Sequence, residues 1–273
     1  MATHGSAFPI AKLALNNSVP PILMASLRMG IVLILLLPFW KFKIPEKKYI
    51  KSLVLFSLSM GVMVYVFMNL SLKYSNFISP IIIGSQLAIP FGVLASAIML
   101  NENISKKKWL FVITAFIGIV IVFFDPDLKN NLLGLFFATL MALFFAMAQV
   151  YSRDLRKLNI YLINASTGLF GFFVLMLVSV FIEGNTVNNI QNINIETWLL
   201  IFYQAIIVSL FAHMSMFYLY RIYPVKKVFP FYALFPIFGV IQTFFIFSEI
   251  PTLLTFLGGG IVILAIYLLN KQE

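Results

Sequence analysis

The chain alternates between long apolar runs and short polar clusters, a pattern typical of a protein that crosses a membrane several times. A helix that spans the hydrocarbon core of a bilayer needs about 20 apolar residues. Cutting the sequence at its polar clusters gives runs near that length at residues 20–40, 50–72, 77–100, 107–124, 131–151, 160–182, 197–220, 226–248 and 252–270. The pattern predicts an all-α integral membrane protein.

A further apolar run, at residues 2–15, is shorter than the others. A helix of that length would reach only about 21 Å, whereas the hydrocarbon core is about 30 Å thick. Two interpretations are open: the recorded sequence starts inside its first helix, or that helix crosses only half of the bilayer. With this run included, we predict ten transmembrane helices, of which the first is truncated.

The composition supports a membrane protein and excludes other classes. Hydrophobic residues make up 62% of the 273 residues and charged residues only 10%, which excludes an ordinary soluble domain. The net charge of +10 does not indicate nucleic-acid binding, because the basic residues lie in short clusters between the apolar runs. The chain has no cysteine, so it contains no disulfide and no thiolate site.

Lysine and arginine are distributed unevenly between alternate loops. If the chain begins in the cytoplasm, the loops on that side hold most of its 19 basic residues, at residues 41–51, 106–108, 153–157, 221–227 and 271. The loops on the other side hold only Lys73 and Lys129. Because basic loops stay in the cytoplasm, we predict an inner (plasma) membrane protein with both termini cytoplasmic.

The order of elements occurs twice along the chain. A proline-marked apolar helix ends at Glu102 and is followed by another apolar helix, and the same order recurs around Glu249. Glu102 and Glu249 are 147 residues apart, as are Gly92 and Gly239. This spacing predicts two five-helix repeats, one in residues 1–125 and one in residues 126–273.

The loop charges also predict that the two repeats are inverted. The cluster at residues 106–108 corresponds to the lysine-free segment 249–252, and the loop with Lys73 alone corresponds to the basic loop 221–227. Equivalent loops then face opposite sides of the membrane. Inverted repeats in a membrane protein favour a transporter whose site lies between them.

Three sets of residues carry a resemblance to a known family. They are the stretch from Ile89-Pro90-Phe91-Gly92 to Ser105, the stretch from Phe235-Pro236-Ile237-Phe238-Gly239 to Pro251, and, near the start, Gly5, Phe8, Lys12 and Leu27-Arg28. In this order they resemble the signature of the EamA-like family of the drug/metabolite transporter superfamily. His4 departs from the pattern, since the family usually has Trp there. The likeness covers nearly the whole chain.

The resemblance implies a secondary transporter that moves small organic metabolites, often amino acids or related compounds, by alternating access and frequently outward. Within the family, the alternative is an uptake carrier for a nucleotide-like or vitamin-like metabolite. Outside it, the alternative is a membrane protein that transports nothing, such as an integral enzyme or an assembly subunit. An enzyme would usually gather acids or histidines at one membrane face, but the nine acidic residues here are scattered. We predict no catalytic residue and no cofactor.

Two polar stripes mark candidate substrate-binding residues. Gly61, Tyr65 and Asn69 recur every four residues and share one helix face, and Ser209 and His213 repeat that spacing in the matching helix, followed by Phe217. Polar groups are costly inside a membrane, so they face a cavity or another helix. Both interpretations, a substrate site and a helix-packing stripe, are open.

His213 is also a candidate proton carrier, because an imidazole titrates near neutral pH and His213 is the only histidine deep in a predicted span. The alternative is a hydrogen-bonded packing residue. Transport that has the same pH profile in a His213→Gln variant would rule out the proton role. With His4 as the only other histidine and no cysteine, we predict no metal site.

Three amides lie within predicted spans. Gln86 comes one turn before Pro90, Gln242 follows Pro236 in the corresponding helix, and Gln149 lies in the sixth helix. Proline leaves carbonyl groups without a donor, so amides nearby can line a polar pathway and bind a substrate. Alternatively, each amide bridges two helices.

Two basic residues lie inside predicted helices rather than in loops. Arg28 is about eight residues into its helix, roughly 12 Å along the axis. It either snorkels to the surface, which we favour, or needs a partner, which can be a carboxylate, backbone carbonyl groups or an anionic substrate. No carboxylate lies within the predicted spans. Lys12 either attracts an anionic group of the substrate or marks the outer end of the first helix.

Glu102 and Glu249 each lie at a helix boundary and are followed by Ser105 and Thr252. A carboxylate is stabilised near a helix N-terminus, and Ser or Thr is a common N-cap. We therefore favour a structural role for both acids.

Overall fold

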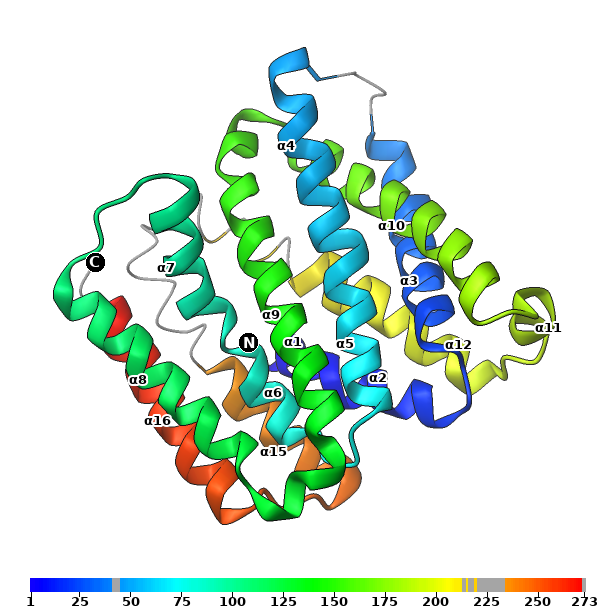
Figure 1. The fold of residues 1–273 in the computed structure, drawn as a ribbon. Helices are drawn as coiled ribbons and strands as arrows, with labels where there is room; N and C mark the ends of the chain where they lie inside the picture. Colours follow the sequence, from blue (N-terminus) through cyan, green and yellow to red (C-terminus); the bar gives the residue numbers. More distant parts are fainter. Residues whose placement is uncertain (41–44, 213–214, 216–218, 220–233, 272–273) are drawn as a thin grey trace.

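The computed structural model describes residues 1–40, 45–212, 215, 219 and 234–271, and within them the chain is helical and contains no strand (Figure 1). The first predicted repeat (1–125) contains α1 (Ala2–Gly5), α2 (Ala7–Asn16), α3 (Pro21–Leu36), η1 (Leu37–Phe39), α4 (Lys47–Ser57), η2 (Leu58–Met63), α5 (Val64–Lys73), α6 (Ser79–Ser85), α7 (Ala88–Met99) and α8 (Lys106–Phe123). The second contains η3 (Pro126–Asn131), α9 (Leu132–Ser152), η4 (Asp154–Lys157), α10 (Ile160–Ile182), α11 (Thr186–Gln191), α12 (Ile195–Tyr203), η5 (Gln204–Ala212), α15 (Phe235–Phe247) and α16 (Leu253–Asn270).

Six of the predicted spans are confirmed as helices long and apolar enough to cross a bilayer. They are Pro21–Phe39, Lys47–Lys73, Ser79–Met99, Pro126–Ser152, Ile160–Ile182 and Ile195–Ala212. Two shorter apolar helices, Phe235–Phe247 and Leu253–Leu269, fall within the last two predicted spans. Helix α8 covers the run at 107–124, and α1 with α2 covers the short first run. The total of ten spans stays a prediction.

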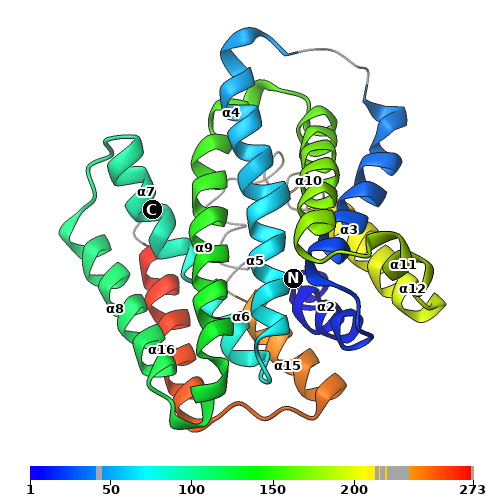
Figure 2. The same ribbon diagram turned by 45° about the vertical axis from the view of Figure 1, so that its right-hand side comes forward.

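Several helices pack side by side along their lengths. In both views, α8 lies along α16, α5 along α9, and α3 along α10 (Figures 1 and 2). The α8–α16 crossing is close because glycines meet there. A Cβ atom on Gly258 would lie 2.5 Å from the carbonyl oxygen of Gly118, which is nearer than real Cβ atoms come. Small residues of this kind let membrane helices pack without side chains between them.

Hydrogen bonds join the loops at one end of the bundle. The Glu249 carboxylate accepts bonds from the backbone N–H groups of Ile78 and Ser79, and the hydroxyl of Thr252 donates to Asp125. Glu183 accepts from the backbone N–H groups at the start of α3, and Asn17 donates to Thr197. We call this the acidic end. All these loops were predicted to lie on the side opposite the basic clusters.

Other hydrogen bonds join loops at the opposite end, which we call the basic end. Arg153 pairs with Glu102, and Ser52 donates a 2.6 Å bond to Asp154. These loops were predicted to share the side that carries the lysine clusters. Loops that the charge pattern assigns to one side of the membrane therefore lie at one end of the bundle, as expected for inverted repeats. Which end faces the cytoplasm stays a prediction.

The helix that carries Gln86 is broken into α6 and α7. Pro90 has no N–H group to donate to the carbonyl oxygen of Gln86, four residues earlier. The backbone N–H of Ile89 donates to that oxygen instead, at 3.1 Å, in a tighter turn. The tighter turn therefore satisfies the carbonyl group locally, within the span.

Ser105 and Thr252 are N-caps, as predicted. The Ser105 hydroxyl accepts from the backbone N–H of Lys108, and the Thr252 hydroxyl accepts from that of Thr255. The two caps are 147 residues apart and start α8 and α16, which occupy the same place in the two repeats. The repeat is therefore visible in cap geometry as well as in sequence.

Candidate functional site

Three polar side chains from three helices meet in the interior of the bundle. Arg28 lies at the middle of α3, Tyr65 near the start of α5, and Ser209 in η5; their exposed fractions are 2%, 6% and 7%. The Arg28 Nε donates a 2.9 Å hydrogen bond to Ser209 Oγ, and the guanidinium carbon lies 4.4 Å from the centre of the Tyr65 ring. The Tyr65 and Ser209 hydroxyl oxygens are 3.5 Å apart. We call these residues the central cluster.

Both helices that supply the hydroxyl groups are locally π-helical. Segment η2 directly precedes Tyr65, and η5 contains Ser209. The two segments occupy matching places in the two repeats. A π-helical turn is wider than an α-helical one and occurs often at functional sites. Gly61 in η2 also brings helix α10 close, because a Cβ atom there would lie 2.5 Å from the carbonyl oxygen of Thr167.

The structure corrects our preferred interpretation of Arg28. Its side chain does not snorkel to the surface but is buried against α5 and η5. The reason is an acceptor from a distant part of the chain, since Ser209 lies 181 residues further on. One guanidinium nitrogen, Nη1, is buried and has no hydrogen-bond partner within the described part of the chain.

Asn69 lies one turn beyond Tyr65 on α5 and is 1% exposed. Its side-chain N–H donates a 2.8 Å bond to the carbonyl oxygen of Pro21, at the start of α3, while its Oδ1 has no partner among the described residues. Asn69 therefore connects α5 to α3. Gln204, which we did not predict, is similar: it is fully buried, donates to the carbonyl of Ala7 at 2.7 Å, and its Oε1 has no partner. The sequence signal that could have identified Gln204 is a single amide within an apolar run.

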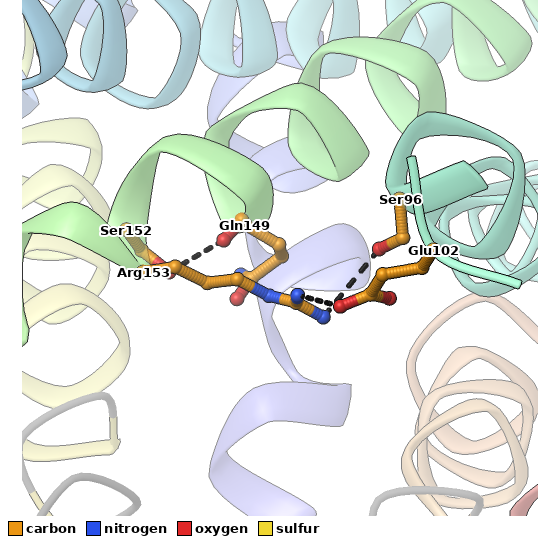
Figure 3. Close-up of polar contacts among 5 residues, drawn as sticks. All are labelled: Ser96, Glu102, Gln149, Ser152 and Arg153. Atoms are coloured by element: carbon orange, nitrogen blue, oxygen red, sulfur yellow. Dashed lines mark hydrogen bonds and ion pairs between the residues drawn. The ribbon is translucent and has the colours of Figure 1, made fainter. Parts of the chain in front are cut away.

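The three predicted amides do not come together. Gln86 is buried at the joint of α6 and α7 and donates to Ser85 Oγ at 3.2 Å. Gln242 donates to the carbonyl of Ala2 at 3.0 Å and so connects α15 to the start of the chain. Gln149 has an exposed side chain at the basic end, beside Arg153 (Figure 3).

Lys12 caps a helix rather than facing the central cluster. Its Nζ donates 2.7 Å bonds to the carbonyl oxygens of Leu72 and Ser75, at the end of α5. A cation at a helix C-terminus satisfies carbonyl groups and opposes the helix dipole. Lys12 therefore marks the acidic end of the bundle. His213, the predicted proton carrier, lies outside the residues that the structure describes.

The two equivalent acids, Glu102 and Glu249, have different surroundings. Glu249 is 9% exposed and accepts bonds of 2.7 and 2.8 Å from two backbone N–H groups at the start of α6. Glu102 pairs with Arg153 at the basic end, where both side chains are about 40% exposed (Figure 3). A third group there, the hydroxyl of Ser96, accepts a 3.5 Å bond from Arg153.

Within the described ranges, no group of three His, Asp or Glu side chains is placed to hold a metal ion. The chemistry of the central cluster is instead that of recognition. It offers one positive charge, two hydroxyl groups and an aromatic face, in a site built from both repeats.

Comparisons with known proteins agree with this architecture. The model of the EamA-like transporter family matches residues 1–124 and 132–271. No curated protein matches the chain. A solved structure described only as "Crystal structure of protein" has a TM-score of 0.64 and 15% sequence identity, and the match covers 97% of this chain and 94% of that one. At that identity the match shows a common fold.

We expect Glu249→Gln to destabilise the protein and Glu102→Gln to have little effect. A buried carboxylate that accepts two backbone bonds contributes about 1.5–3 kcal/mol per charged hydrogen bond, whereas an exposed ion pair contributes about 0–1 kcal/mol. The free energy of unfolding of both purified variants, measured by detergent titration against the wild type, checks this. Equal losses for the two variants would contradict the assignment.

Proposed function

Because the chain belongs to the EamA-like transporter family, we propose that it is a secondary transporter that exports amino acids or related small metabolites by alternating access across an inner membrane. Members of this family are membrane transporters of small molecules. We infer outward transport from the resemblance to this family, and the arrangement of polar groups in the bundle supports the proposed substrate class and mechanism.

The central cluster is the observation that carries the proposal. Arg28 and Tyr65 come from the first predicted repeat (1–125) and Ser209 from the second (126–273). Transporters built from inverted repeats bind their substrate where the repeats meet, near the middle of the membrane. An amino acid has a carboxylate that suits a guanidinium and a side chain that suits an aromatic face.

The two ends of the bundle differ in how firmly the repeats are joined, which supports alternating access. At the acidic end, the side chains that bridge the repeats are buried: Asp125 is 3% exposed, Asn131 0% and Thr197 1%. At the basic end, the polar contacts that bridge the repeats, Glu102 with Arg153 and Ser52 with Asp154, lie at the surface, where such contacts contribute little. We infer a state closed at the acidic end. Opening that end would break the bonds of Glu249, Glu183 and Asn17.

A comparison of cells that lack the protein with cells that overproduce it tests the proposed function. We expect overproduction to enrich one or a few amino acids or related metabolites in the medium and to deplete them in the cytosol, as mass spectrometry of both fractions would detect. Cells that overproduce an unrelated membrane protein to the same level control for stress on the envelope. Purified protein in liposomes should then exchange the same metabolite.

Three results would contradict the proposal. A metabolite that accumulates in the cytosol of overproducing cells would indicate uptake. An unchanged metabolite profile, together with liposomes that exchange nothing, would indicate a protein that does not transport metabolites. Modification of a lipid by the purified protein would indicate an integral enzyme.

A further inference from the structure

Arg28 has a positive charge in a place where the protein provides little to balance it. The residue is 2% exposed and lies at the middle of a helix that is apolar enough to span a membrane. Removing a charged group from water costs several kcal/mol even after the surroundings relax. A guanidinium also stays protonated at any physiological pH, so it cannot escape this cost by losing its proton.

Two contacts offset part of that cost. The face of the Tyr65 ring, 4.4 Å from the guanidinium carbon, gives a cation–π interaction of about 2 kcal/mol when it is shielded from water. Ser209 accepts a hydrogen bond from Nε. These partners are neutral. Among the residues that the structure describes, no acceptor reaches the buried Nη1, which is a further penalty in an apolar interior.

The chain itself has no carboxylate to offer at this depth. Its nine acidic residues lie at positions 46, 102, 125, 127, 154, 183, 196, 249 and 273, all outside the apolar runs. Where the described acidic residues accept hydrogen bonds or form ion pairs, they do so at the two ends of the bundle, as Glu183 and Glu249 do at the acidic end. An anion that neutralises Arg28 must therefore come from outside the chain.

We propose that Arg28 binds the carboxylate of the transported solute, with Nη1 as the free donor and the Tyr65 and Ser209 hydroxyl groups beside it. The inference rests on the proposed function, because it makes the solute of that transport a carboxylic acid. A planar carboxylate matches the fork of a guanidinium. One positive charge balances one carboxylate, whereas a phosphate dianion would leave a buried negative charge.

This assignment gives the hydroxyl groups distinct tasks. The Ser209 hydroxyl accepts from Nε and fixes the plane of the guanidinium, so Ser209 is a positioning residue. The Tyr65 ring lies against the guanidinium and its hydroxyl reaches the same region, so it can donate a hydrogen bond to the bound carboxylate. The two repeats would then contact one ligand group together, which is how its binding can couple to their relative movement.

Thermal unfolding of the purified protein in detergent tests the site without any need for transport. The probes are 3-phenylpropionate, which has a single carboxylate, and each of the twenty amino acids, and every carboxylate is compared with its amide. Inorganic phosphate tests the other anion class. The variants are Arg28→Gln and Arg28→Met, and Arg156→Gln, an exposed arginine at the basic end, is the matched control.

We expect at least one carboxylate, and not its amide, to raise the unfolding midpoint of the wild type and of Arg156→Gln. Both Arg28 variants should bind it on the order of 10- to 100-fold more weakly, as loss of a charged hydrogen bond implies. Arg28→Met keeps a similar volume without a buried charge, so it should fold even if Arg28→Gln does not. Ser209→Ala should weaken binding less than either.

The proposal is overturned if amides stabilise the wild type as well as carboxylates do, if the Arg28 variants respond like the wild type, if phosphate alone binds, or if no carboxylate binds. Other results distinguish this proposal from the proposed function. A carboxylate that binds through Arg28 but does not cross liposome membranes would refute transport but not the binding site. A solute that Arg28→Met transports as well as the wild type does would refute the binding site but not transport.

Discussion

In the apolar interior of a bilayer a backbone N–H or C=O group without a partner costs several kcal/mol, and each helix end exposes up to four such groups. This fold satisfies several of them with side chains from other segments of the chain. Glu249 accepts from two N–H groups at the start of α6 and Glu183 from two at the start of α3, in each case across the two repeats. Lys12 donates to carbonyl oxygens at the end of α5, within the first repeat. At the acidic end, the hydrogen bonds of Glu249 and Glu183 therefore cap a helix and join the two repeats at the same time.

The same constraint makes Arg28 informative. The buried amides Asn69 and Gln204 donate to Pro21 and Ala7, and each keeps one neutral oxygen without a partner among the described residues. Arg28 is buried as deeply, but the group that it leaves without a partner among these residues belongs to a full positive charge. An anion from outside the chain would balance this charge. The cost of a buried, unbalanced charge in a membrane protein is therefore the reason to expect a substrate with a carboxylate.

Local patterns were predictable from the sequence, and contacts between distant segments were not. Six spans follow from uninterrupted apolar runs, and the caps at Ser105 and Thr252 follow from a hydroxyl residue before such a run. The burial of Arg28 depends on Ser209 in another helix, so its helix alone suggested snorkelling. Likewise Glu249 caps α6 rather than its own helix, and Gln149, though inside an apolar run, is exposed at the basic end. Each of these outcomes depends on packing between the repeats.

The central claim is that two inverted repeats enclose the central cluster, and the sidedness of two loops tests it most directly. The chain has no cysteine, so single variants Lys107→Cys and Ile250→Cys can be labelled without background; both positions are exposed, Ile250 at 72%. A maleimide that cannot cross membranes should label Ile250→Cys in intact cells and Lys107→Cys only after the cells are permeabilised. Labelling of both from the same side would contradict the inverted architecture, and with it a site between the repeats.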